Sequence, residues 1–300
     1  MTDDLRVTER PNEATVDVDL LSPLEVVRLI NSEDRKVAEA VGRSDEAIAR
    51  AVTGIMGSFG RGGRLIYVGA GTSGRLGVLD ASECPPTFST PESQVLGIIA
   101  GGDHALRHAS EGAEDDAGSG STALDAVAIL PEDTVCGVTA SGRTPYVQGA
   151  LRHARDLGCF TILVTCNPGA ELLGDADCVI APVVGPEVIA GSTRLKAGTA
   201  TKLVLNALTT ASLTLSGKVY SNLMVDLRPG SYKLVERARW ILTYLLGVSR
   251  ERAGELFEAS GRNVKVALVM GKRCLDRGTA ERLLARCGGF LRKALSEPGA

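Results

Sequence analysis

A glycine-rich stretch after a short apolar run carries the clearest chemistry in this sequence. Residues 65–68 are apolar and favour a β-strand, and the loop that follows places Thr72 and Ser73 between glycines. Glycine lets the backbone turn tightly and approach a ligand, and the first amides of a following helix are unsatisfied donors that favour negative charge. We therefore predict a phosphate cradle between a strand and a helix. Its residues are Gly71, Thr72, Ser73 and Gly74.

Two glutamates are candidates for acid and base chemistry. Glu83 directly precedes Cys84-Pro85-Pro86, where we expect the helix to end, and Glu114 lies in the acidic run 111–116. Two carboxylates can act as acid and base when their surroundings set their pKa values apart. The residue pattern alone favours a simpler interpretation, in which both are solvated surface carboxylates.

The spacing Gly69-x-Gly71-x-x-Gly74 also matches the fingerprint of dinucleotide-binding proteins. That fingerprint requires an acidic residue about 20 positions further on, at the end of the second strand. The next strand-like run is 95–100, and the first carboxylate after it is Asp103, which lies well beyond that spacing. The sequence therefore disfavours a nicotinamide-dependent oxidoreductase.

A second strand, loop and helix repeat the pattern of the first. Residues 133–139 predict a strand, the loop 140–144 is rich in Ser, Gly and Thr, and Pro145 is suited to begin a helix that runs to about Leu157. The carboxyl ends of parallel strands meet at one edge of an open sheet, so the two loops should converge on one ligand. The residues expected to contribute from this loop are Thr139, Ser141, Gly142 and Thr144.

A third polar stretch, 191–202, opens a long helix that we expect to reach about Ser216. Ser192 or Thr193 can cap it, but Arg194 and Lys196 lie where the helix dipole disfavours cations. This local cost predicts an anion nearby, with Ser192 and Lys196 as further phosphate contacts. Solvated charges at the start of a helix explain the pattern equally well.

His104, His108 and Glu111 would share one face if residues 104–116 formed a helix. Histidines four apart can chelate a metal, but this spacing is short and common, so we expect no metal site. Residues 117–122, rich in Gly and Ser, are expected to form a flexible surface loop.

The order of elements predicts an α/β protein with a doubly wound parallel sheet. Strand-like runs at 160–165 and 178–184 follow those above, and no hairpin signal interrupts the alternation with helices. Two helices should precede the sheet, the first starting at Ser22-Pro23 and the second near Ser44. We expect one domain over residues 1–245 and a small helical subdomain over 246–300. Its helices should lie at 250–259, 263–272 and 279–295, the last interrupted at Gly288-Gly289.

The composition narrows the function classes. The 300 residues are 44% hydrophobic, so they can bury a sizeable core. A net charge of −3 does not indicate the basic surface that nucleic-acid binding requires. No basic segment followed by an apolar one begins the chain, and no apolar run approaches the ~18 residues of a membrane span. The seven cysteines lack Cys-x-x-Cys spacing, which favours reduced thiols. We expect a cytoplasmic protein without a membrane or nucleic-acid partner.

Several of these stretches together resemble the N-acetylmuramic acid 6-phosphate etherases, a family related to glucokinase regulatory protein. The resemblance extends from about Leu21 to Leu295 and departs locally at 227–232. It implies a sugar isomerase (SIS) fold, a homodimer with sites near the subunit interface, and a lyase of peptidoglycan recycling that needs no cofactor. The motifs that carry it are 69–86, 111–115, 140–147, 191–202 and 222–226.

The resemblance also implies roles for single residues. Glu83 corresponds to the family's general acid and Glu114 to its general base, while Ser73, Thr139, Ser141 and Thr144 resemble the phosphate-holding hydroxyls of SIS domains. The implied substrate is a phosphosugar from which D-lactate is removed. Two alternatives share the fold: an aldose–ketose phosphosugar isomerase, and a regulator that binds a phosphosugar without turnover.

Overall fold

The computed structural model describes residues 6–297 and contains a sheet of five parallel strands. The strand order is β2-β1-β3-β4-β5, so the chain leaves β1 for one edge and returns to β1's other side as β3. This reversal is a topological switch point, where open α/β sheets bind ligands. The predicted doubly wound parallel sheet is confirmed. The strands are β1 (Leu65–Gly69), β2 (Val95–Ile99), β3 (Thr134–Val138), β4 (Phe160–Val164) and β5 (Cys178–Ile180).

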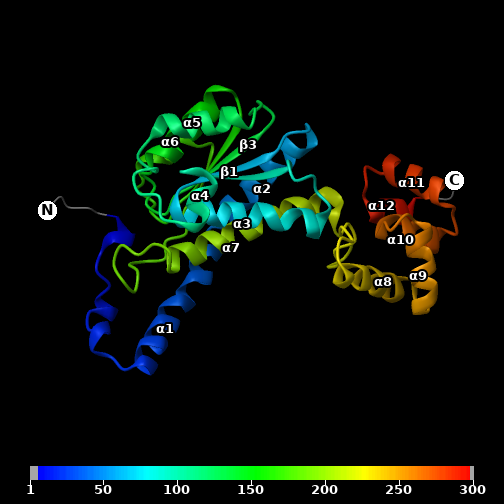
Figure 1. The fold of residues 1–300 in the computed structure, drawn as a ribbon, viewed down its shortest axis with the longest axis horizontal. Coiled ribbons are helices and arrows are strands. Elements are labelled where there is room, and N and C mark those ends of the chain that lie inside the picture. Colours follow the sequence, from blue (N-terminus) through cyan, green and yellow to red (C-terminus); the bar gives the residue numbers. More distant parts are fainter. Residues whose placement is uncertain (1–5, 298–300) are drawn as a thin grey trace. The chain divides into compact units, whose positions relative to one another are not determined.

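Helices cover both faces of the sheet, with α5 and α6 on one face and α3 and α7 on the other (Figure 1). The first helix begins as predicted, because the backbone N–H of Ser22 donates to Glu25 Oε2 at 2.9 Å. Apolar side chains of the three central strands and of α5 and α6 form one buried core. The helices of this part are α1 (Pro23–Gly42), α2 (Asp45–Gly60), α3 (Gly71–Phe88), α4 (Gly102–Arg107), α5 (Ala117–Ala126), α6 (Pro145–Asp156) and α7 (Lys196–Leu213).

The chain divides into two compact units by its internal contacts. The first holds the sheet and comprises the chain up to Ser82 together with Ser93–Thr209; the second comprises Glu83–Glu92 and the chain from Thr210 onward. The predicted domain boundary between residues 245 and 246 stays a prediction. Within residues 6–297, no helix combines the length and apolar character that crossing a membrane requires.

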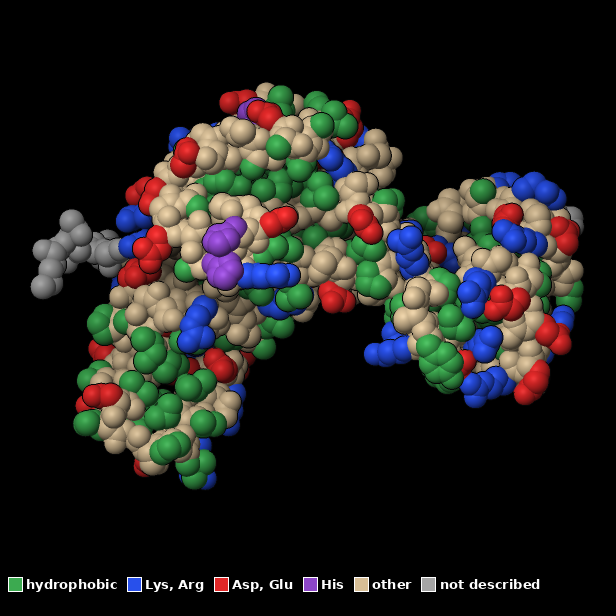
Figure 2. All heavy atoms as spheres, viewed as in Figure 1, with side chains coloured by type: hydrophobic (Ala, Val, Ile, Leu, Met, Phe, Trp, Pro, Cys, Tyr) green, Lys and Arg blue, Asp and Glu red, His purple; other side chains and the backbone are tan. Residues whose placement is uncertain are grey.

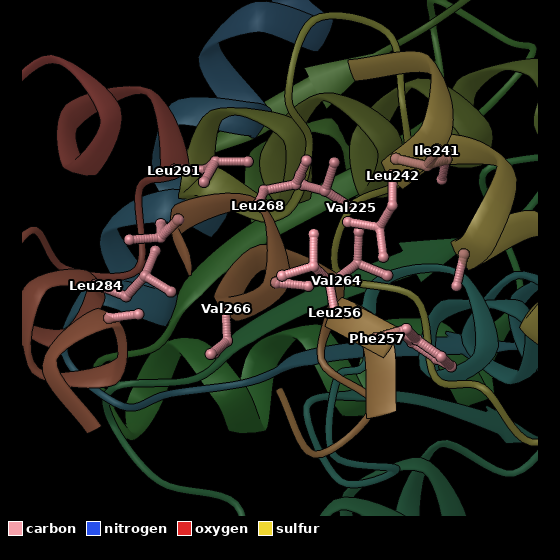
Figure 3. Close-up of a cluster of buried hydrophobic side chains, with 14 of the residues drawn as sticks. Val225, Ile241, Leu242, Leu256, Phe257, Val264, Val266, Leu268, Leu284 and Leu291 are labelled. Carbon is pink, nitrogen blue, oxygen red and sulfur yellow. The ribbon is translucent and has the colours of Figure 1, made fainter. Parts of the chain in front are cut away.

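The second unit has its own apolar core, in which Phe257, Leu242 and Leu268 are almost fully buried (Figure 3). The helical segment expected over 279–295 is interrupted at Gly288 and Gly289 as predicted, because both adopt positive φ, at 64° and 79°. The helices of this unit are α8 (Tyr232–Leu246), α9 (Arg250–Ala259), α10 (Val264–Arg273), α11 (Arg277–Arg286) and α12 (Leu291–Ser296).

The expected loop at 117–122 is wrong, because these residues belong to α5. The Asp116 side chain caps the helix by accepting from the backbone N–H of Ser119 at 3.1 Å. The glycines serve close packing: a Cβ on Gly120 would lie 2.0 Å from the carbonyl oxygen of Tyr146, and one on Gly149 would lie 1.9 Å from that of Ala117. Glycine here lets α5 and α6 touch backbone to backbone.

The expected end of the helix before Pro85 is also wrong, because α3 continues through both prolines to Phe88. A proline removes one backbone donor and leaves the carbonyl four residues earlier without its helical partner. For Pro86 that carbonyl belongs to the exposed residue Ser82, where water can replace the lost bond. The two prolines therefore lie in the last turn of α3, and the helix does not end before them.

Candidate active site

A polar pocket of about 320 Å³, here called the cradle pocket, lies at the carboxyl ends of β1 and β3. The first glycine-rich loop forms one wall through Gly71, Thr72 and Ser73. Two other glycines make this tight turn possible, because a Cβ on Gly69 would lie 2.7 Å from Gly74 N and one on Gly74 would lie 2.6 Å from Ile99 Cγ1. Gly74 thus shapes the loop and is not among the residues that line the pocket.

The second predicted loop forms the facing wall with a cluster of hydroxyls. The hydroxyl of the buried Thr139 lies 2.8 Å from that of Thr144 and 3.3 Å from that of Ser141. The backbone N–H of Gly142, whose φ is +69°, donates to Thr139 Oγ1 at 3.2 Å. The structure thus brings both predicted loops to one pocket. Gly142 supports the loop from behind, because it is buried and does not line the pocket.

Glu114 lies on the rim that the cradle pocket shares with a smaller neighbour of about 220 Å³. Its side chain is exposed, and its carbonyl accepts from the backbone N–H of Tyr146 at 3.0 Å, which ties this loop to the start of α6. The smaller pocket, here called the alanine pocket, is lined largely by alanines together with Gly71, Arg75, Glu111 and Glu114. A carboxylate at this position can reach a ligand in either pocket.

The Arg75 guanidinium in the alanine pocket is engaged by backbone carbonyls. It donates to the carbonyl oxygens of Ala105 at 2.7 Å, Leu106 at 3.1 Å and His108 at 3.0 Å. These bonds hold the end of α4 and the start of the loop that carries Glu114. We therefore interpret Arg75 as a support for that loop.

Glu83 lines neither pocket and is exposed on α3. Its predicted role as a general acid stays a prediction. Ser192 is likewise outside the lining of the cradle pocket, although its neighbours Gly191 and Thr193 belong to it.

Lys196 is buried, 1% exposed, and also lies outside the lining of the cradle pocket. Its Nζ donates to Glu33 Oε2 at 2.6 Å, while the backbone N–H groups of Lys196 and Ala197 each donate to the buried Glu187 carboxylate at 2.9 Å. The anion predicted near the start of α7 is therefore present as two carboxylates of the protein itself. The ammonium of Lys196 is used within this buried network, which separates it from the predicted phosphate contact.

The pKa values of these two carboxyls shift in opposite directions. Burial alone would raise the pKa of Glu33, but hydrogen bonds from Lys196, Lys36 and Asn12 outweigh it and lower the pKa to about 2. Burial raises the pKa of Glu187, because the two backbone N–H donors and Lys196 only partly offset the loss of water. Glu33 is thus the carboxyl that this network holds most firmly in its charged form.

Two groups of residues that line the cradle pocket were not predicted from the sequence. Gly198 and Thr201 lie three apart on α7, a helical spacing that could have placed them on one face. Arg6 and Glu9 come from the N-terminal segment, where no sequence signal was available, because that segment is held by residues about 160 positions away.

The possible histidine site does not form on one helical face. Helix α4 ends at Arg107, so His108 is extended and Glu111 lies in the loop. The rings of His104 and His108 stack with centroids 4.6 Å apart. Among residues 6–297, no three His, Cys, Asp or Glu side chains converge in a way that could hold a metal ion.

The fold and the cradle pocket define a protein of the SIS-domain class. The sequence model of the glucokinase regulatory protein N-terminal SIS domain matches residues 47–155. A solved structure of a candidate phosphosugar isomerase involved in capsule formation, from Bacteroides fragilis, superposes with a TM-score of 0.52 at 18% identity, covering 67% of this chain and 95% of that one. At this identity the superposition supports the fold alone.

Full-length relatives narrow the assignment further. N-acetylmuramic acid 6-phosphate etherase of Mesorhizobium japonicum is 52% identical over 99% of this chain and 97% of its own. The etherase of Rhizobium rhizogenes is 50% identical over 97% of this chain and 94% of its own. The chain belongs to the N-acetylmuramic acid 6-phosphate etherase family.

Proposed function

We propose that this protein is a carbon–oxygen lyase that converts N-acetylmuramic acid 6-phosphate and water to N-acetylglucosamine 6-phosphate and D-lactate. The observation that carries the proposal is a pocket lined by hydroxyl groups with a glutamate on its rim. The chain that forms it aligns with an etherase over 99% of its length. An isomerase of the same fold would keep the ether intact, and a regulator would bind without turnover. The full-length relatives favour the etherase over both.

The phosphate binds in the cradle pocket. Hydroxyls of Ser73, Thr139, Ser141 and Thr144 line it, and the N-terminus of α3 supplies backbone amides and a favourable dipole. Gly71 and Thr72 let the phosphate approach these amides closely. Anion binding by neutral donors leaves the charged rim residues for the sugar.

The chemistry is an elimination followed by an addition. In the ring-opened sugar the C2 hydrogen lies beside the C1 aldehyde, which makes it acidic enough for Glu114 to remove as a proton. The electron pair of that C–H bond becomes a C2–C3 double bond while the C3–O bond breaks, and Glu83 gives the departing lactate oxygen a proton. Water then adds its hydroxyl at C3 and a proton at C2. The two carboxyls finish in their starting protonation states.

We further propose that the chain works as a homodimer in the cytoplasm, without a metal or organic cofactor. Apolar side chains gather uncovered over α1 and the residues before it (Figure 2). Such a contiguous apolar surface is typical of an interface between proteins. The most exposed of its members are Val16, Leu20, Leu24, Val27 and Ile30. All seven cysteines are free thiols, which agrees with a reducing compartment.

The dimer also explains how Glu83 can act. Glu114 lines the cradle pocket, whereas Glu83 lines neither that pocket nor the alanine pocket. An acid and a base acting on neighbouring carbons must both lie within hydrogen-bond reach of one substrate. We therefore propose that each active site combines Glu114 of one subunit with the equivalent of Glu83 from the other.

The test is D-lactate release from N-acetylmuramic acid 6-phosphate by the purified protein in the presence of a chelator. The unphosphorylated sugar is the control. Release from the phosphorylated sugar alone is the expected result. Saturable binding of the phosphosugar without release would replace the etherase by a regulator, and conversion to a ketose would replace it by an isomerase.

A further inference from the structure

The N-terminal segment 6–15, here called the strap, contributes part of the wall of the cradle pocket. Arg6 and Glu9 are its lining residues, and the short 3₁₀ helix Val7–Glu9 sets their direction. With Glu114 they are the charged residues among those that line this pocket. Glu9 is thus a carboxylate in the site that neither the phosphate cradle nor the elimination uses.

The strap is fastened at the level of Glu9. The backbone N–H of Val7 donates to Asn167 Oδ1 at 2.9 Å, and Asn167 Nδ2 donates to Thr8 Oγ1 at 3.2 Å. The carbonyl of the fully buried Thr8 accepts from the backbone N–H of Gly191 at 3.3 Å. Terminal segments usually fray unless they are tied down, so these bonds give Glu9 a defined position.

The strap is fastened again a few residues later, to the buried network at the start of α7. Asn12 Nδ2 donates to Glu33 Oε2 at 3.1 Å and to the carbonyl of Pro186 at 3.2 Å. Thr15 Oγ1 donates to the carbonyl of Val188 at 2.9 Å. Glu33 in turn holds Lys196, the first residue of the helix that brings Gly198 and Thr201 to the pocket.

Gly191 leaves room for the Glu9 carboxylate beside the pocket. A Cβ at Gly191 would lie only 3.3 Å from Glu9 Oε2, and its φ of +77° is one that other residues rarely adopt. Glu9 Oε1 lies 3.5 Å from the Thr8 hydroxyl, a long contact that leaves most of its accepting capacity for a ligand. The carboxylate is half-buried, so an added hydrogen bond there is only partly replaced by water.

The chemistry of the substrate limits what Glu9 can meet. The phosphate and the lactyl carboxylate are anions, which a carboxylate repels. In the cyclic sugar the ether occupies C3, the acetamide C2, the ring oxygen C5 and the phosphate C6. The free hydroxyls are those on C1 and C4, and both are donors that a carboxylate accepts well.

We propose that Glu9 is a specificity residue that contacts the substrate and accepts a hydrogen bond from the C1 or C4 hydroxyl of the phosphosugar. The proposal takes its ligand from the proposed function. It adds a residue from the N-terminal segment to a site otherwise built from the sheet and its helices. The strap thereby lets the pocket distinguish sugars by a hydroxyl as well as by the phosphate.

The experiment measures, by calorimetry, the binding of the 3-deoxy analogue of N-acetylglucosamine 6-phosphate to the full-length protein. The free hydroxyls of this sugar are those on C1 and C4, and it has no group at C3 to eliminate. Glu9→Ala should weaken binding about 10- to 100-fold, the usual effect of losing a hydrogen bond to a charged group. Glu13→Ala is the matched control, because Glu13 is exposed on the same strap and lies outside the pocket lining. Thermal unfolding of Glu9→Ala and of the similar-sized Glu9→Gln checks that both variants fold.

The decisive comparison uses two analogues that lack the C1 or the C4 hydroxyl. We expect one of them to bind the unchanged protein about 10- to 100-fold more weakly than the parent sugar, but to bind Glu9→Ala as well as the parent does. Equal losses for both proteins with both analogues would overturn the proposal. Failure of the unchanged protein to release lactate would overturn the proposed function instead.

Discussion

The sharpest test of the shared active site mixes two inactive variants. Glu114→Gln removes the proposed base and Glu83→Gln the proposed acid, and each change keeps the size of the side chain. Each variant alone should lose activity by about 100-fold or more, the usual contribution of general acid or base catalysis. The question is whether they restore each other when one chain of each forms a dimer.

The activity expected of the mixed dimer follows from the positions of Glu83 and Glu114. Glu114 lines the cradle pocket, whereas Glu83 lines neither the cradle pocket nor the alanine pocket. An acid and a base acting on neighbouring carbons must both reach one substrate. If the acid therefore comes from the partner, a mixed dimer holds one site with both changes and one with neither. Its activity should be about half that of the unchanged dimer.

The assay is D-lactate release by mixed dimers that carry a different affinity tag on each chain and are purified on both tags. Glu111→Gln is a matched control, because Glu111 belongs to the same acidic run as Glu114 but lies outside the lining of the cradle pocket. Mixed dimers of Glu111→Gln with the unchanged chain should be fully active. Mixed Glu83→Gln and Glu114→Gln dimers without activity would refute the shared site, and a monomeric active protein would refute the dimer.

Three further predictions concern the cradle, the buried network and the glycine contact. Thr139→Val removes the hydroxyl at the centre of the cluster and should raise the KM for the phosphosugar about tenfold, measured by lactate release. The carboxyl of Glu33 has its pKa lowered from 4.5 to about 2, so it stabilises the fold above pH 4.5 and loses that contribution as the pH falls from 4.5 to 2. Glu33→Gln should lower the free energy of unfolding by roughly 3–5 kcal/mol at neutral pH and flatten its acid dependence in urea titrations. Gly120→Ala should cost about 3 kcal/mol or more because its Cβ meets a backbone carbonyl, whereas Gly118→Ala on the same helix, whose Cβ meets only a side-chain oxygen at 3.3 Å, should cost little.

The strands and the two polar loops could be predicted from sequence because their signals are local. Each strand is a short apolar run, and the glycine and hydroxyl residues of 69–74 and 139–144 lie directly where those runs end. The parallel topology follows from the alternation with helices, so the convergence of both loops follows as well. The helix start at Ser22-Pro23 has an equally local signal in its capping box.

The failures came from residues whose role depends on distant partners. Gly120 looks like a flexible loop residue in sequence, yet the backbone carbonyl of Tyr146 leaves no room for a Cβ there. Lys196 looks like a phosphate ligand because its partner Glu33 lies 163 positions away. A local pattern shows which roles a residue could have, but the partner that it contacts in the fold decides its actual role.

Because Lys196 is used within its buried network, the proposed phosphate site is made largely of neutral donors. A lysine within the cradle would attract any phosphate, whereas hydroxyls and backbone amides bind only when their geometry fits. The wall of the cradle pocket formed by Gly198 and Thr201 depends on where α7 begins. Hydrogen bonds to Glu187 and Glu33 fix that start. The same Glu33 accepts from Asn12, which fastens the strap that carries Glu9. One buried carboxylate thus connects the phosphate wall to the wall proposed to recognise the sugar hydroxyl, so loss of Glu33 should weaken binding at both.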